Sequence, residues 1–260
     1  MILVTNDDGV YSPGIIALAK AISRSNEVKV VAPKGAQSSS GMSVTFHRPV
    51  RISGVKLKNY EATAIGGTPA DCVFVSVHKL LGRKKIDMVV SGINMGGNIS
   101  MQSFFSSGTV SAAMSGSVMG IKAVAFSKET SSEDEFLTEK EFETSAWWAE
   151  RIVSYLMKNG FPEGVDMLNV NFPVKTRRTT PVRITRMAGE MFDDYVVERK
   201  DPRGNRYFWL AGTKKVRAER GTDLYTVLTR HEISITPISV NSIQRNSLEE
   251  HEKYFRDMLR

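Results

Sequence analysis

The chain begins Met1-Ile2-Leu3-Val4-Thr5-Asn6-Asp7-Asp8-Gly9, a short apolar run that leads directly into two adjacent carboxylates. Such a run, bounded by turn residues, is typical of a strand buried within a parallel sheet. The sequence then favours a helix, because Ser12 is a good N-cap and Pro13 suits the first helical position. We therefore expect the chain to open with a βα unit whose connecting turn carries Asp7 and Asp8.

The alternation of short apolar runs with helical patterns continues as far as residue 173. We expect further strands at 28–32, 87–91, 123–126 and 167–172, and helices at 13–23, 69–81, 109–119 and 142–157. Strands that alternate with helices imply right-handed crossovers and a parallel sheet covered by helices on both faces. The predicted fold class is therefore α/β, with a three-layer core over residues 1–173 built on a mostly parallel sheet.

The pattern changes in residues 174–260, which we expect to form an extension packed on the core. The predicted elements are a strand at 182–186, a hairpin with strands 194–197 and 207–210 around a turn at 201–205, a short helix or turn at 222–229, a strand at 233–238 and a terminal helix at 248–259. The hairpin is rich in aromatic residues, among them Tyr195, Tyr207 and Trp209. It either contacts another subunit or folds back onto its own domain.

Composition indicates a soluble globular protein. The 260 residues are 41% hydrophobic and 24% charged, which excludes a disordered chain. No stretch approaches the roughly 20 apolar residues of a membrane helix, and the first residues do not form a signal peptide. The single cysteine, Cys72, excludes an internal disulfide. These features predict a cytoplasmic protein with no membrane partner.

The surplus of positive charge is concentrated in one segment. The whole chain carries 35 Lys/Arg and 28 Asp/Glu, a surplus of 7, and residues 174–220 hold 13 against 6, which is the same surplus. A basic segment attracts phosphate-bearing ligands or nucleic acid, but it is equally the surface of a solvated hairpin. The charge leaves both interpretations open.

Two adjacent carboxylates follow the first predicted strand, at the edge where open parallel sheets bind ligands. Asp7 and Asp8 repel each other unless a divalent cation offsets their charge, and oxygen ligands are those that Mg²⁺, Mn²⁺ and Ca²⁺ prefer. An aspartate before Gly9 also serves simply to cap a helix or to shape a turn. On the residues alone, both interpretations remain.

Three further segments are expected at the same edge. Loops 37–41 and 91–98 are rich in small residues, hydroxyls and amides, and Ser38 and Asn94 offer neutral oxygens to a metal. The sequence Ser106-Ser107-Gly108-Thr109-Val110 stands at a predicted helix N-terminus, whose free N–H groups can bind phosphate. Each signal is weak alone, and their convergence on one edge favours a phosphate-handling site.

Common nucleotide-binding and metal-binding motifs are missing from the sequence. Gly9 and Gly14 have the spacing of a P-loop, but Ile15-Ile16 replace its Lys-Ser/Thr. No G-x-G-x-x-G follows the first strand, which argues against a dinucleotide cofactor. The four histidines form no metal-spaced pair.

Several segments together resemble the stationary-phase survival protein SurE family, whose members are metal-dependent nucleoside monophosphate phosphatases. The matching segments are residues 4–9, 31–33, 67–73, 90–98, 107–110 and 234–237. They follow the family's order over nearly the full chain. One departure is visible, because Phe104-Phe105-Ser106 stand where other members carry a histidine.

The resemblance implies functions for particular residues. The implied metal ligands are Asp7, Asp8, Ser38 and Asn94, with Ser39 and Ser40 as alternatives to Ser38. The implied phosphate contacts are Asn94, Asn98, Ser107, Gly108 and Thr109, and the implied catalytic residues are Asp7 and Asp8. The resemblance further implies one Mn²⁺, Mg²⁺ or Co²⁺ ion per subunit and nucleoside 5′- and 3′-monophosphates as substrates. It also implies a Rossmann-like core and a homodimer or homotetramer in which elements of the C-terminal extension are exchanged.

Alternatives for mechanism and function stay open. The attacking group is a metal-activated water, which we favour because both carboxylates are committed to the metal, or it is Asp7 or Asp8 itself. The same site would serve an exopolyphosphatase or a broad phosphatase. A nucleotide- or nucleic-acid-binding regulator would use the basic stretch 174–220, but this reading leaves the carboxylates unexplained. Fold alone does not exclude a nucleotide- or sugar-transferring enzyme.

Overall fold

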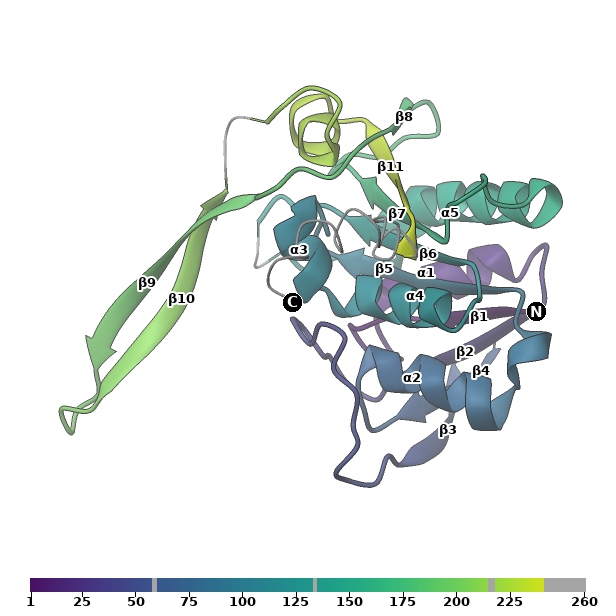
Figure 1. The fold of residues 1–260 in the computed structure, drawn as a ribbon, viewed down its shortest axis with the longest axis horizontal. Helices are drawn as coiled ribbons and strands as arrows, with labels where there is room; N and C mark the ends of the chain where they lie inside the picture. Colours follow the sequence, from purple (N-terminus) through teal and green to yellow (C-terminus); the bar gives the residue numbers. More distant parts are fainter. Residues whose placement is uncertain (58–59, 133–134, 215–217, 241–260) are drawn as a thin grey trace, which may run out of the picture.

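The computed structural model describes residues 1–57, 60–132, 135–214 and 218–240. Among these residues, nine strands form one sheet through the centre of the molecule, in the spatial order β3-β4-β2-β1-β5-β6-β7-β11-β8 (Figure 1). The strands are β1 (Ile2–Thr5), β2 (Val28–Pro33), β3 (Ile52–Leu57), β4 (Tyr60–Ile65), β5 (Met88–Met95), β6 (Ala123–Lys128), β7 (Met167–Phe172), β8 (Val182–Ile184) and β11 (Ile233–Ile238).

Most neighbouring strands are parallel, as the sequence predicts. β1 pairs in parallel with both β2 and β5, and the parallel pairing continues through β6 to β7. The outer strands differ, because β3 is antiparallel to β4 and β11 is antiparallel to β7. The carboxyl ends of β1, β2, β5 and β6 therefore lie at one edge of the sheet.

Helices cover both faces of the sheet, which completes the predicted three-layer α/β fold (Figure 1). These helices are α1 (Pro13–Ile22), α2 (Pro69–Val75), α4 (Gly108–Val118) and α5 (Glu139–Asn159). α1 and α5 pack together on one face, and α2 and α4 pack together on the other. In β1, Ile2 and Val4 belong to the first core and Leu3 to the second, because side chains of a strand alternate between faces. This burial on both sides explains the unbroken apolar run at the start of the chain.

Some elements differ from the sequence-based predictions. β3 (Ile52–Leu57), β4 (Tyr60–Ile65) and the short helix α3 (Ser100–Ser106) are not predicted by the residue pattern. The predicted helix at 69–81 is α-helical only to Val75 and continues as a π-helical turn. The predicted helix at 142–157 begins earlier, at Glu139, since a capping box forms at its N-terminus. The predicted helix at 248–259 lies outside the described residues.

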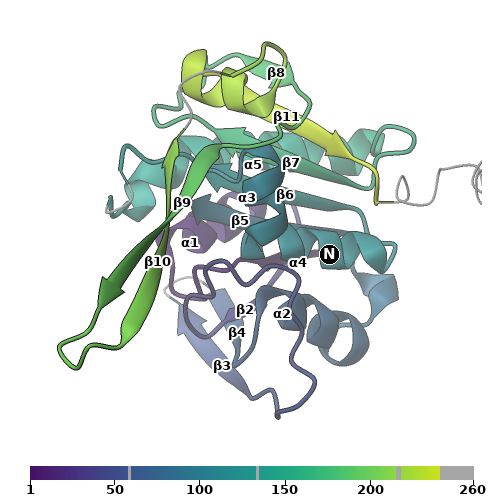
Figure 2. The same cartoon turned by 60° about the vertical axis from the view of Figure 1, so that its left-hand side comes forward.

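The residues after 173 add strands to the core sheet and also project from it. β8 and β11 extend the sheet beyond β7, and a π-helical turn, Tyr225–Thr229, lies where a short helix or turn is predicted. β9 (Phe192–Lys200) and β10 (Arg206–Lys214) form a separate two-stranded hairpin that extends away from the core (Figures 1 and 2). The hairpin is longer than predicted, and the alternative in which it folds back on its own domain is wrong. Its exposed apolar residues include Tyr195, Val196, Phe208, Trp209 and Leu210.

Candidate functional site

Four loops meet at the carboxyl edge of the sheet and are joined by hydrogen bonds. The carbonyl of Asp7, after β1, accepts from the backbone N–H of Gln37, after β2, at 2.8 Å. The N–H of Gly41 donates to the carbonyl of Ser106 at 3.1 Å, which links the β2 loop to the end of α3. The N–H of Met95, at the end of β5, donates to Asp8 Oδ2 at 3.3 Å. The predicted convergence of these segments on one edge is therefore found in the structure.

The turn after β1 is built by Asn6, so the two carboxylates that follow are available for other partners. Asn6 Nδ2 donates to the carbonyl of Gly9 at 3.0 Å and to Ser12 Oγ at 2.7 Å. Gly9 has a φ of 99°, a conformation that favours glycine. Ser12 is the N-cap of α1, as predicted. Asn6 and Ser12, rather than Asp7 and Asp8, therefore shape the turn after β1 and cap α1.

Asp7 is buried against the N-terminus of α4. Its side chain is held by Thr109, whose Oγ1 donates a hydrogen bond to Asp7 Oδ1. Burial raises the pKa of Asp7, while the hydrogen bonds from the Thr109 hydroxyl and from the backbone of Gly108 and Thr109 lower it. The anion that the positive end of α4 stabilises in this structure is therefore the Asp7 carboxylate.

Asp8 lies beside Asp7 and has fewer donors. Burial, together with the neighbouring charge of Asp7, raises the pKa of Asp8 to about 7, with only the Met95 N–H acting in the opposite direction. The charge of Asp7 thus disfavours the ionised form of Asp8. A cation between them would remove this repulsion.

The serine loop brings one hydroxyl toward Asp7. Ser38 and Ser39 are exposed, whereas Ser40 Oγ is buried and has no hydrogen-bond partner among the residues that the structure describes. A Cβ atom added to Gly108 would lie 2.9 Å from Ser40 Oγ and 2.9 Å from Asp7 Oδ2. Ser40 and Asp7 thus converge on Gly108. The assignment of Ser38 as a ligand stays a prediction, and of the three neighbouring serines Ser40 has the buried, unpartnered oxygen.

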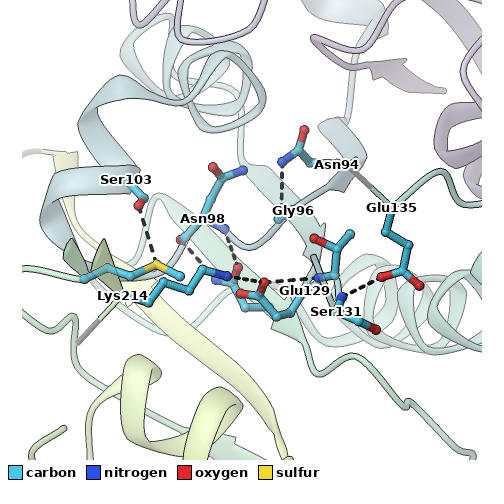
Figure 3. A network of polar contacts seen from close by, with 11 residues as sticks. Asn94, Gly96, Asn98, Ser103, Glu129, Ser131, Glu135 and Lys214 are labelled. Atoms are coloured by element: carbon cyan, nitrogen blue, oxygen red, sulfur yellow. Dashed lines mark hydrogen bonds and ion pairs between the residues drawn. The ribbon is translucent and has the colours of Figure 1, made fainter. Parts of the chain in front are cut away.

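Asn94, near the end of β5, and Asn98, in the loop that follows, have different environments (Figure 3). Asn94 Nδ2 donates to the carbonyl of Gly96 at 2.7 Å, which fixes the orientation of its amide. Asn98 is 7% exposed, and its Nδ2 donates to Ser127 Oγ at 2.8 Å. The backbone N–H of Asn98 donates to Asn171 Oδ1 at 2.8 Å. Asn98 therefore fixes the loop to β6 and β7, and its contact with phosphate stays a prediction.

The first turn of α4 uses its hydroxyl groups internally. Ser107 is the N-cap, and its Oγ accepts from the N–H of Val110 at 3.1 Å. The Thr109 hydroxyl is directed to Asp7. Gly108 has no side chain, and this absence lets Asp7 and Ser40 approach the helix end. The backbone N–H groups of Gly108 and Thr109 bond Asp7, so the turn and the Asp7 carboxylate form one polar unit at the end of α4.

The donor set suits a hard cation rather than zinc. Within the described ranges, no group of three or more His, Cys, Asp or Glu side chains lies close enough together to hold a metal ion. The two carboxylates would need neutral oxygens from serine, asparagine amide or water to complete a coordination shell. Oxygen-only shells with one or two carboxylates are those of Mg²⁺ and Mn²⁺.

Residue patterns miss two charged residues at this edge. Glu129 directly follows β6 and is 3% exposed, and its Oε1 forms an ion pair with Lys214 Nζ at 2.8 Å. The position of Glu129 at a strand end is a usable signal, since the other site loops also follow strands. The approach of Lys214, at the end of β10, has no signal in the sequence.

None of the helices in the described part of the chain is long and apolar enough to span a membrane.

Comparison with known proteins places these features in a family. The family model described as "Survival protein SurE" matches residues 2–194. The chain is 41% identical to the 5′-nucleotidase SurE of Methanocella arvoryzae over 98% of both chains. It is 44% identical to the 5′-nucleotidase SurE 1 of Thermus thermophilus over 95% of both. Among solved structures, the crystal structure of the SurE protein from Aquifex aeolicus superposes with a TM-score of 0.79 at 35% identity, covering 96% of this chain and 99% of that one.

Proposed function

The chain belongs to the SurE family, and we propose from this premise that it hydrolyses nucleoside monophosphates to nucleoside and phosphate with the help of a divalent cation. In enzyme class it is a phosphoric monoester hydrolase. The observation that carries the proposal is the buried Asp7–Asp8 pair beside the N-terminus of α4. The pair needs positive charge, and a cation bound to it would in turn attract an anion such as a phosphoryl group to this edge of the sheet.

We propose one cation per subunit, Mn²⁺, Mg²⁺ or Co²⁺, held by Asp7, Asp8, Asn94 and a serine of the loop 38–40. The residues fit such an ion, because the carboxylates lack a balancing charge and the buried Ser40 oxygen lacks a partner within the described chain. When bound, the cation would supply Lewis-acid stabilisation of the phosphoryl oxygens and a more acidic water. Ser38 remains our assigned serine ligand, with Ser40 as the alternative that the buried hydroxyl supports.

The protein's own residues orient the reactants in this proposal. The phosphate is contacted by Asn94, Asn98, Ser107, Gly108 and Thr109, chiefly through amide and backbone N–H donors. The Thr109 hydroxyl donates to Asp7, which favours the ionised form of its carboxyl group and fixes its orientation. Water attacks phosphorus in this proposal. The Asp7 carboxylate is already hydrogen-bonded to α4, and the Asp8 carboxylate is needed as a negatively charged ligand of the cation. Trapping a phosphorylated aspartate during turnover would contradict this choice of nucleophile.

The experiment that tests the proposal is phosphate release from a substrate panel. Purified protein is treated with EDTA and then receives Mn²⁺, Mg²⁺ or Co²⁺ with nucleoside 5′- and 3′-monophosphates, polyphosphate and a short oligonucleotide. We expect release from the monophosphates only after the metal is restored. Undiminished release in EDTA would contradict metal dependence. Release from polyphosphate alone would favour an exopolyphosphatase, and oligonucleotide binding without turnover would favour a regulator.

We also propose how the chain assembles and where it acts. Residues 1–173 form the catalytic core, and residues 174–260 form an extension that joins subunits into a homodimer or homotetramer. The exposed apolar hairpin supports this, because an aromatic surface of this kind is typical of a protein interface. The single buried cysteine, Cys72, suits a reducing cytoplasm as the place of action.

A further inference from the structure

A buried carboxylate lies next to the loop that is proposed to contact phosphate. Glu129 follows β6, and the backbone pairing of Gly96 N–H with the Lys128 carbonyl at 2.8 Å brings the two loops together. A Cβ atom added to Gly97 would lie only 2.8 Å from Glu129 Oε2. This oxygen is buried and has no hydrogen-bond partner among the described residues. Glu129 thus places a negative charge directly behind the Gly97–Asn98 segment.

The charge of Glu129 is balanced from the hairpin. Lys214 Nζ lies 2.8 Å from Glu129 Oε1, which also accepts from the N–H of Thr130 at 3.1 Å (Figure 3). The adjacent lysine, Lys128, directs its ammonium group to the carbonyls of Pro173 and Val174 instead. Within the part of the chain that the structure describes, Lys214 is the cation that an ion pair joins to Glu129.

The base of the hairpin is fixed to the same edge on its other strand. Gln102, on α3, accepts through Oε1 from the backbone N–H groups of Met191 at 3.1 Å and Phe192 at 3.0 Å. Its Nε2 donates to Asp194 Oδ2. α3 leads directly into the N-cap of α4. Both ends of the hairpin are therefore fastened to the site, and the position of Lys214 is fixed relative to Asn98.

We propose that Lys214 is a positioning residue that permits phosphate binding by neutralising Glu129. This inference rests on the proposed function, because it assumes that the site beside Asn98 receives a phosphoryl group. A carboxylate without its partner would repel a phosphate dianion, and burial makes that repulsion stronger than it would be in water. Lys214 thereby makes the affinity for the charged part of the substrate depend on a residue of the hairpin.

The test compares charged and neutral ligands of one site. In Lys214→Met we expect the Ki of inorganic phosphate and the KM of AMP to rise about tenfold, with kcat changed by less than about threefold. The Ki of adenosine, which carries no charge, should stay within about twofold of the wild type. Lys214→Arg should restore phosphate binding. The double variant Lys214→Met/Glu129→Gln should also restore it, to within about threefold, since neither charge remains.

Controls separate this effect from a general loss of structure. Arg206→Gln removes a comparable ion pair, with Glu198, on the same hairpin and should leave all constants unchanged. Equal weakening of phosphate and adenosine binding in Lys214→Met, or failure of the double variant to recover, would overturn the proposal.

If Lys214→Met does not fold, Glu129→Gln alone decides. This variant should tighten phosphate binding, and unchanged or weaker phosphate binding would contradict the inference. Calorimetric binding of phosphate tests it independently, so an enzyme inactive on nucleotides would refute the proposed function without deciding this inference.

Discussion

At the scale of single residues, the account depends on how two buried carboxylates are held. Asp7 is stabilised by the first turn of α4, while Asp8 relies on one long hydrogen bond from Met95. The sequence alone identifies both residues and their edge of the sheet, because they follow an apolar strand. It does not identify which serine lies near them, since three consecutive serines have the same chemistry and only the path of the loop buries Ser40.

Thr109 offers a test of the way Asp7 is oriented. Thr109→Val keeps the shape of the side chain but removes the hydroxyl that donates to Asp7. Hydrogen bonds to charged groups contribute about 1.5–3 kcal/mol, so we expect kcat/KM to fall by at least about tenfold. Thr109→Ser should recover most of the activity. Steady-state kinetics at saturating metal measure both, and equal activity of the valine and serine variants would contradict the assigned hydrogen bond.

The pKa of Asp8 predicts a pH dependence of stability in the metal-free protein. Folding raises this pKa from 3.8 to about 7, so the folded state binds a proton more tightly than the unfolded chain between these values. Stability from this group is present below the lower pKa and is lost as pH rises toward the upper one. In EDTA, the Tm of the wild type should therefore fall relative to that of Asp8→Asn as pH rises from about 4 to about 7. A difference in Tm that is constant with pH would contradict the shift.

At the scale of elements, tertiary contacts determine the strands and helices that the local residue pattern does not predict. The strands and helices of the central layers are predicted from the sequence because their apolar residues repeat with a clear period. β3 is not, since it is an outer strand with mostly exposed residues, and it forms by pairing with β4. The short helix α3 has no strong period either. Its first turn is fixed by bonds to the segment 188–194, which is distant in sequence.

Substitutions of Asp223 test how strongly its hydrogen bonds join the segment after residue 173 to α3 of the core. Its carboxylate is fully buried and accepts from the backbone N–H groups of Ser100 and Ala188 at 2.8 Å and of Leu224 at 2.7 Å. Asp223→Ala would leave these donors without an acceptor, at a cost of about 3 kcal/mol or more in the free energy of unfolding. Asp223→Asn retains one acceptor oxygen and should cost less. Urea unfolding measures both variants, and a loss below about 1 kcal/mol for alanine would contradict this role.

At the scale of the whole molecule, the central sheet carries the candidate site, and the β9–β10 hairpin projects away from the core. The aromatic content of the hairpin is visible in the sequence, but its separation from the core is not, because the same residues would also suit a buried strand. In the structure Trp209 is 59% exposed and Leu210 is 85% exposed. Large apolar side chains with this exposure on a projecting element support the subunit contact proposed above.

We expect the double variant Trp209→Ser/Leu210→Ser to dissociate the homo-oligomer, because it removes apolar area from the surface proposed to join subunits. Sedimentation velocity should show a shift from dimer or tetramer toward monomer. Val118→Ser is the matched control, since Val118 is 62% exposed on α4 and lies outside the hairpin. An unchanged sedimentation coefficient for the double variant would place the subunit contact elsewhere.

The most direct test of the whole account is a calorimetric titration of the EDTA-treated protein with Mn²⁺. We predict one ion per chain in the wild type, an affinity at least about a hundredfold lower in Asp8→Asn, and no change in the control Asp87→Asn, whose carboxylate pairs with the N-terminus at the far end of the sheet. Binding of Mn²⁺ to Asp8→Asn with the stoichiometry and affinity of the wild type would contradict the claim that Asp7 and Asp8 hold the cation.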